Sequence, residues 1–350
     1  METNMGNNEM NQQRTVVLQE KPRKKRKIGL WIFLGILAVF FLMILGAFFF
    51  GGDTEYSYAV KEPYIATVYV EGTIASGNVD SLGIATGYQH AWTLEQIDYL
   101  MSDENNKGLI LFVDSPGGGV YESDELYLKI KEYQEATKNP VYAAMGNMAA
   151  SGGYYISAPA DKIYANRNTW TGSIGVTMGT LFDVSELLQK YGIKTHTITS
   201  GANKAMGSPV DPMTEEQRAI FQSLIDEAYD QFTGIVSTER EIPIEATKKL
   251  ADGRIYTAKQ ALKLKLIDKI GTYDEALADM RTTYNLVECT QVDVRYQDNS
   301  LFGSLLAKSG LEKALASAAG MAGKSDVAEI LGMVKDPNET PVSYLCDYLK

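Results

Sequence analysis

Apolar and polar residues alternate in blocks along the middle of this chain, and the blocks predict strands and helices in turn. The segments expected as strands are rich in apolar or β-branched residues, and they are 65–72, 108–114, 140–146, 161–167, 173–176 and 194–201. The strand 108–114 is expected to stop in a turn at 115–119. Helical spacing and capping residues predict helices from Thr93, from Glu122 to Ala136, from Ser151, and from Val184 to Gly192. This alternation predicts an α/β fold around a parallel sheet, with functional residues beyond the carboxyl ends of the strands.

The chain beyond residue 213 is mostly helical in its pattern. Thr214 and Gln217 have the spacing of a capping box, and apolar residues from Phe221 to Ile235 recur at helical intervals, so a long helix is expected there. Shorter helices are expected within 244–253 and 257–271. Residues 296–350 are rich in Ala, Gly and Ser and then polar, and we expect them to form a mobile tail.

The first 50 residues follow a different pattern. Residues 1–27 are polar and end in "KPRKKRK", whereas residues 28–50 contain no charge and no proline. A helix of that length rises by about 1.5 Å per residue, which spans a hydrocarbon core of about 30 Å. A cleaved signal peptide is the alternative, but its apolar stretch would be shorter. Because the basic cluster comes first, we expect a cytoplasmic tail (1–27), a single transmembrane helix (28–50), a linker (51–63) and an extracytoplasmic domain (64–295) at the cell membrane.

The charge of the chain changes across this boundary. Residues 1–27 carry seven Lys and Arg against three Glu, so the rest, with 26 basic and 41 acidic residues, has a net charge of −15. An acidic domain of this kind argues against a nucleic-acid partner.

The two cysteines, Cys289 and Cys346, lie far apart, and their pairing stays open. The two histidines are also far apart, and no metal-binding motif and no cofactor is expected.

Ser151 is the first candidate for chemistry, in the stretch "NMAASGGYY". It stands where a predicted strand meets a predicted helix, which exposes a hydroxyl beside free backbone amides. Gly152 and Gly153 leave room for a substrate backbone. The motif departs from the G-x-S-x-G hydrolase elbow because Ala149 replaces the first glycine, so close packing of two elements is the alternative explanation.

A serine nucleophile needs a base, and histidine is a poor candidate here. His90 lies in a loop, and His196 lies within an expected strand. Lys204 follows that strand in a glycine-flanked loop of small uncharged residues, "SGANKAMGSP", which would not hold the ammonium form. A solvated surface lysine is the alternative.

The glycine run "DSPGGG" supplies candidate oxyanion donors, because glycines after a buried strand let backbone N–H groups face a ligand. A tight turn is the alternative. We interpret Asp114 as a residue that caps this turn and Ser115 as structural.

Five segments in this order resemble the signal peptide peptidase A family of membrane-anchored serine peptidases. They are "DSPGGG", "NMAASGGYYISA", "TGSIGV", "SGANKAMGSP" and "ADGRIYTAKQALKLKLIDKIG", and the resemblance runs from about Tyr64 to Leu277. It implies a crotonase/ClpP-like fold of repeated β-β-α units. Three positions depart from the pattern. Asn203 precedes Lys204 where tyrosine is common in the family, and Ala258 and Lys265 stand where glycines are common.

The resemblance also implies residue roles. Ser151 matches the nucleophile and Lys204 the general base of a Ser-Lys dyad. Gly118 and the Ser151 backbone amide match the oxyanion hole. The implied substrate groove comprises Gly117, Gly119, Gly152, Gly153, Thr171, Gly172, Ser173, Ile174 and Gly175. Family members form homo-oligomeric rings or domes in which the serine and lysine of one site can come from neighbouring subunits.

The expected activity is therefore endopeptidase cleavage of remnant signal peptides and other unfolded apolar segments after secretion. Acyl-CoA chemistry on the same fold is an alternative, but an extracytoplasmic domain has no CoA supply. A scaffold, or a protease for one membrane partner, is another. The apolar segment 344–346 near the end of the chain is a candidate self-substrate for the groove of a neighbouring subunit.

Overall fold

The computed structural model describes residues 60–78 and 87–296 and the backbone of 343–345, all within the second of two units, Tyr58–Lys350. The predicted tail 1–27, span 28–50 and most of the linker and of the tail 296–350 lie outside these residues. Within the described ranges, no helix combines the length and the hydropathy needed to cross a bilayer.

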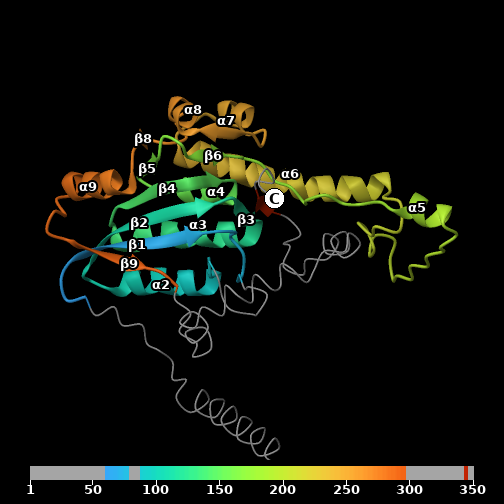
Figure 1. Ribbon diagram of the computed structural model, residues 1–350, viewed down its shortest axis with the longest axis horizontal. Coiled ribbons are helices and arrows are strands. Elements are labelled where there is room, and N and C mark those ends of the chain that lie inside the picture. Colours follow the sequence, from blue (N-terminus) through green and yellow to red (C-terminus); the bar gives the residue numbers. More distant parts are fainter. Residues whose placement is uncertain (1–59, 79–86, 297–342, 346–350) are drawn as a thin grey trace, which may run out of the picture. The chain divides into compact units, whose positions relative to one another are not determined.

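A mostly parallel sheet forms the centre of this unit, as the sequence predicted (Figure 1). Its strands are β1 (Tyr64–Glu71), β2 (Asn106–Ser115), β4 (Val141–Ala150), β5 (Lys162–Ala165), β6 (Trp170–Gly172), β7 (Ile255–Thr257), β8 (Lys269–Ile270) and β9 (Thr290–Val294). The order is β7-β6-β4-β2-β1-β9, and β5 lies between β4 and β8. All of these pairs are parallel except β6 with β7.

Helices cover both faces of the sheet. The helices of the described residues are α2 (His90–Ser102), α3 (Val120–Thr137), α4 (Gly152–Ser157), α5 (Ser185–Lys190), α6 (Glu215–Glu239), α7 (Ile244–Leu250), α8 (Ala258–Lys263) and α9 (Tyr273–Thr283). Alternate residues of β2 enter two different cores: Leu109 and Leu111 face α3 and α4, whereas Ile110 faces α9. A strand buried on both faces explains why its sequence is a continuous apolar run rather than an alternating one.

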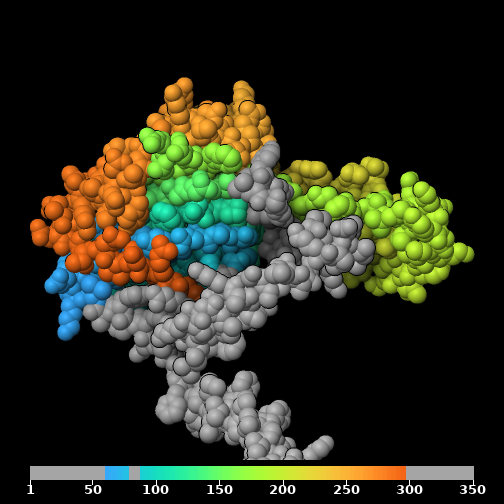
Figure 2. Space-filling model, viewed as in Figure 1, coloured from blue at the N-terminus to red at the C-terminus, as the bar shows by residue number. Residues whose placement is uncertain are grey.

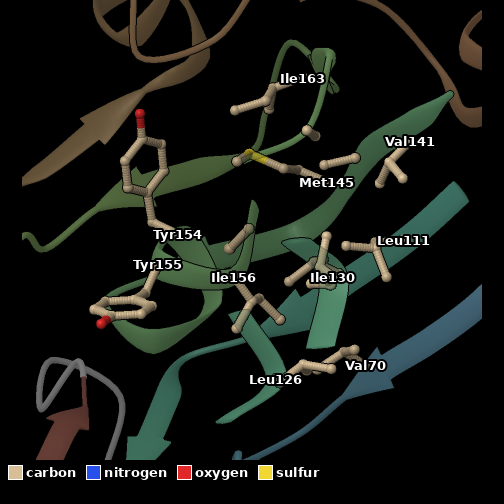
Figure 3. Packing of buried hydrophobic residues seen from close by; sticks show 14 of the residues in the cluster. Val70, Leu111, Leu126, Ile130, Val141, Met145, Tyr154, Tyr155, Ile156 and Ile163 are labelled. Atoms are coloured by element: carbon tan, nitrogen blue, oxygen red, sulfur yellow. The ribbon is translucent and has the colours of Figure 1, made fainter. Parts of the chain in front are cut away.

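The larger core lies under α3 and α4 (Figure 3). Leu126 and Ile130 from α3 and Ile156 from α4 meet Leu111 and Val141 from the sheet, and all five are fully buried. Burying one such side chain stabilises the fold by about 1.5–3 kcal/mol. This packing fixes α4, and with it the junction that carries Ser151, against the sheet.

Strand β4 changes partner halfway along its length. Its first half pairs with β5, whereas Met148, Ala149 and Ala150 pair with β6. At the change, the Met148 N–H donates to Asp114 Oδ1 at 2.9 Å, and a Cβ on Gly146 would lie 2.9 Å from Asp114 Cβ. Asp114 thus holds the bend that directs the end of β4 toward Ser151.

Two predicted strands are not strands. Residues 194–201 have no regular structure, and Ile198 there is 96% exposed, because no neighbouring strand pairs with them. Residues 173–176 are likewise irregular, and the strand in that region is β6, which ends at Gly172. The predicted capping box at Thr214 and Gln217 is confirmed at the start of α6.

Candidate active site

Ser151 occupies a strained position at the junction of β4 and α4. Its φ is 54° and its ψ is −119°, a region that residues other than glycine rarely adopt. Such a conformation costs about 1–3 kcal/mol and persists only where the surrounding structure enforces it, most often at functional sites. The residue is 1% exposed, and the Tyr154 and Tyr155 N–H groups both donate to its carbonyl at 2.9 Å.

The backbone N–H groups of Ser151 and Gly152 differ in whether they have a hydrogen-bond acceptor. The Ser151 N–H donates to Gly172 O at 2.8 Å, so it is already engaged. The next N–H along the chain, on Gly152, makes no hydrogen bond to any residue that the structure describes. Gly152 therefore offers the free donor at this junction.

The glycine run forms a short strand, β3 (Gly117–Gly119), instead of the tight turn that was the alternative. Ile74 donates to Gly117 O at 2.9 Å and accepts from the Gly119 N–H at 2.8 Å. Because successive peptide groups of a strand point to opposite edges, the N–H and C=O of Gly118 face away from Ile74. A Cβ on Gly118 would lie 1.9 Å from Ile74 O, so only glycine fits here.

The other edge of β3 carries a partner from the far end of the chain. Residues 343–345 form β10 (Ser343–Leu345), which is antiparallel to β3 with Tyr344 opposite Gly118. These three residues of the predicted mobile tail therefore have regular structure. β10 also lies close to α3 and α4, so an extended segment can lie along the glycine strand beside Ser151.

The segment 171–175 lies next to this junction. The Thr171 hydroxyl donates to Ala149 O at 2.6 Å, and the Ser173 N–H donates to Arg254 O at 2.8 Å. Gly172 has a φ of 87° and lies against Tyr256, where a Cβ would approach the ring to 2.5 Å. The sheet thus brings 117–119, 151–153 and 171–175 together around one point.

Lys204 lies apart from this cluster. It is exposed, in the turns that connect α5 to α6, and its backbone N–H donates to Gly201 O at 3.1 Å. Among the described residues, its ammonium group has no hydrogen bond or ion pair, and no contact links it to Ser151. Figures 1 and 2 show the part of this segment around α5 as a lobe set off from the sheet. Asn203 Nδ2 donates to Glu216 Oε1 at 3.0 Å, so Lys204 lies beside the start of α6, whereas Ser151 precedes α4.

The lobe has a cavity of its own. It has a volume of about 530 Å³ and lies between 176–183 and the start of α6, with Met178, Phe182 and Phe221 in its lining. Neither Ser151 nor Lys204 lines it. The cavity is therefore a feature of the lobe and not the site around Ser151.

The two histidines lie in different parts of the fold. His90 is buried in α2, where Nδ1 lies 2.6 Å from the Tyr88 hydroxyl and Nε2 lies 2.8 Å from Glu125 Oε2. His196 is exposed, in the irregular segment that was expected as a strand. Within the described ranges, no three His, Cys, Asp or Glu side chains form a group that could hold a metal ion.

Hydrogen bonds from α4 fix the helix after Ser151. The Tyr154 hydroxyl donates to Leu266 O at 2.8 Å, and burial raises the pKa of Tyr154, so this hydroxyl remains a donor. The Tyr155 hydroxyl donates to Asp124 Oδ1 at 2.6 Å. Gln231 Nε2 donates to the Tyr155 hydroxyl oxygen and to Asp124 Oδ1. Gln231 belongs to α6, so the long helix is attached directly behind the candidate nucleophile.

Comparison with known proteins identifies the family. The sequence profile of Peptidase family S49 matches residues 133–287. A putative signal peptide peptidase SppA of Enterococcus faecium is 39% identical over 240 residues, which cover 69% of each chain. Protease 4 of Haemophilus influenzae is 36% identical over 230 residues, which cover 65% of this chain and 36% of that protein.

The chain belongs to peptidase family S49. It is a serine peptidase, and the family match includes the Ser151 junction and the segment 171–175. The sequence indicated Ser151 from its place where a predicted strand meets a predicted helix, whereas 171–175 came only from the resemblance to the family. Sequence reasoning missed Gly152 as the amide that stays free, since only the three-dimensional pairing of Ser151 with Gly172 shows which amide is used.

Proposed function

We propose that this S49 peptidase cleaves peptide bonds with Ser151 as the nucleophile and Lys204 as the general base. Lys204 Nζ takes the proton of the Ser151 hydroxyl as its oxygen attacks the substrate carbonyl, and it returns the proton to the leaving amine. Water then hydrolyses the acyl-enzyme by the same route. The strained backbone of Ser151, at φ 54°, is the observation that carries the assignment.

Two backbone amides support the oxyanion in this proposal. They are the N–H groups of Gly118 and Gly152, because the Ser151 N–H predicted for this role donates to Gly172 O instead. Gly118 N lies 3.1 Å from the place of a Cβ on Gly152, so both residues border one small space. Losing one such donor typically slows a serine peptidase by a factor of about 10²–10³.

The substrate binds as an added strand on β3. The pairing of β10 with Gly117–Gly119 supports this, since it demonstrates an extended segment in that position. The remaining predicted groove residues, Gly153 and 171–175, border the same space from α4 and β6. The tail is then a candidate self-substrate, and mass spectrometry of the C-terminus after long incubation of active enzyme tests this.

Lys204 reaches Ser151 from a neighbouring subunit. Its exposure and its separation from Ser151 support a homo-oligomeric ring or dome in which the lobe contacts the next copy. Large apolar side chains on the lobe support the same arrangement, because they are 45–96% exposed: Leu181, Phe182, Leu187, Tyr191, Ile193 and Ile198. Exposed apolar surface of this kind marks an interaction site.

The proposal places the chain at the cell membrane, anchored by residues 28–50, with its crotonase/ClpP-like domain (64–295) outside and no nucleic-acid partner. Its substrates are remnant signal peptides and other unfolded apolar segments. The name of the Enterococcus relative, a putative signal peptide peptidase, supports that substrate class.

Cleavage of a synthetic signal peptide by the purified full chain tests the proposal. Ser151→Ala and Lys204→Ala should each abolish cleavage while the proteins keep their wild-type unfolding midpoints. Lys190→Ala, an exposed lysine at the end of α5, is the matched control and should cleave normally. Cleavage by the Ser151→Ala protein would refute the assignment of the nucleophile.

A further inference from the structure

Ser123 has a hydroxyl that is buried and unused. It lies in the first turns of α3, is 0% exposed, and its Oγ has no hydrogen-bond partner among the described residues. Leaving such a group unsatisfied costs about 1–3 kcal/mol. Native proteins contain few of these groups, and a catalytic role is one of the reasons for which they persist.

The hydroxyl lies directly behind Gly152 and Gly118 of the candidate active site. A Cβ on Gly152 would come within 2.5 Å of Ser123 Oγ and within 3.1 Å of Gly118 N. One Cα–H bond of Gly152 points along that same direction, toward Ser123 Oγ. The O–H proton of Ser123 then has no acceptor at rest.

Two other buried serines nearby provide the contrast. Ser115 Oγ accepts the Gly117 N–H at 3.0 Å, and Ser157 Oγ donates to Gly153 O at 2.7 Å. Both hydroxyls are used within the fold, and their roles are structural. Ser123, at a similar depth, differs because its hydroxyl makes no such bond.

We propose that Ser123 is a positioning residue for the oxyanion site, an inference that rests on the proposed function. Its oxygen holds Gly152 in the orientation that presents the free N–H, and its O–H dipole turns toward the negative charge that develops beside Gly152 and Gly118. A dipole held in a dry interior stabilises such a charge without touching it. The hydroxyl is unsatisfied at rest because its partner is the charge of the transition state.

Ser123→Ala in the full chain tests this inference with two separate measurements. Losing a direct oxyanion donor lowers kcat by a factor of about 10²–10³. Because Ser123 acts through Gly152, losing its hydroxyl should lower kcat by only about tenfold and leave KM unchanged. Inhibition by a peptide boronate, which forms a tetrahedral adduct, should weaken by the same factor. The unfolding midpoint should not fall, since the lost hydroxyl made no hydrogen bond.

Ser157→Ala is the matched control, and it should lower the unfolding midpoint while kcat stays at the wild-type value. A Ser123→Ala enzyme with wild-type kcat would overturn the inference. So would a loss of kcat accompanied by a higher KM and a lower midpoint, because that result describes a packing role. If Ser151→Ala remains active, the proposed function itself fails, so the two failures are distinguishable.

Discussion

Replacing Gly118 by alanine tests how tightly the glycine strand is held against Ile74. The added Cβ would lie 1.9 Å from the carbonyl oxygen, 2.5 Å from the carbonyl carbon and 2.7 Å from the nitrogen of Ile74. Non-bonded carbon atoms normally stay about 3.5 Å from their neighbours, so the two backbones must separate by more than about 1 Å. Since all three atoms belong to the backbone, no rotation of a side chain can relieve the overlap.

The separation breaks the two hydrogen bonds that join Ile74 to Gly117 and Gly119, at 2.9 and 2.8 Å. Each is worth about 0.5–1.5 kcal/mol, and the overpacking adds about 1–3 kcal/mol, so Gly118→Ala should destabilise the chain by about 2–6 kcal/mol. It should also remove peptide cleavage, because the Gly118 N–H moves away from the oxyanion site.

Urea unfolding of the full chain measures this loss, with Gly234→Ala as the control. Gly234 lies inside α6 with nothing within 4 Å of a built Cβ, so alanine there should stabilise the helix by about 1 kcal/mol. A Gly118→Ala protein with wild-type stability and cleavage would refute the close contact between β3 and Ile74.

Three further outcomes are expected. Lys265→Gly should raise the free energy of unfolding by about 1 kcal/mol, because Lys265 adopts a left-handed φ of 62° after α8; an unchanged value would contradict this. The hydrogen bond from Lys162 lowers the pKa of Asp279, so this carboxylate stabilises the fold fully above its unfolded pKa of about 4, and the effect is lost as the pH falls through the lower folded pKa. Unfolding at pH 7 and pH 3 should therefore show that Asp279→Asn destabilises the chain more at pH 7 than at pH 3, and an equal loss at both would contradict this. Peptide cleavage should rise with pH toward the alkaline range, because a general base must be unprotonated, and a flat profile from about pH 6 to 10 would argue against a lysine base.

Sequence patterns predicted correctly those helices and strands whose formation depends on residues close together in the chain. The apolar run of β2, the capping box at Thr214 and the helix after Ser151 are all confirmed, since each depends on neighbours within a few positions. The family departure at Lys265 also has a structural reason, because this residue occupies a left-handed position that glycine favours.

Features that depend on distant partners were not predictable in this way. Residues 194–201 have the β-branched composition of a strand but lie in the lobe, where no strand is available to pair with them. The strand β10 was missed because its pairing with β3 is visible only in three dimensions. For the same reason, the sequence indicated Ser151 and Lys204 but left open whether one subunit or two supply them.

Co-expression of two inactive variants tests the central claim most directly. Ser151→Ala and Lys204→Ala chains with different affinity tags are purified together, so each complex contains both. If Ser151 of one subunit works with Lys204 of another, the mixed complex should cleave a signal peptide although neither variant does so alone. Pairing either variant with the Ser151→Ala/Lys204→Ala double variant is the control and should give no cleavage. A mixed complex without activity would contradict a site shared between subunits.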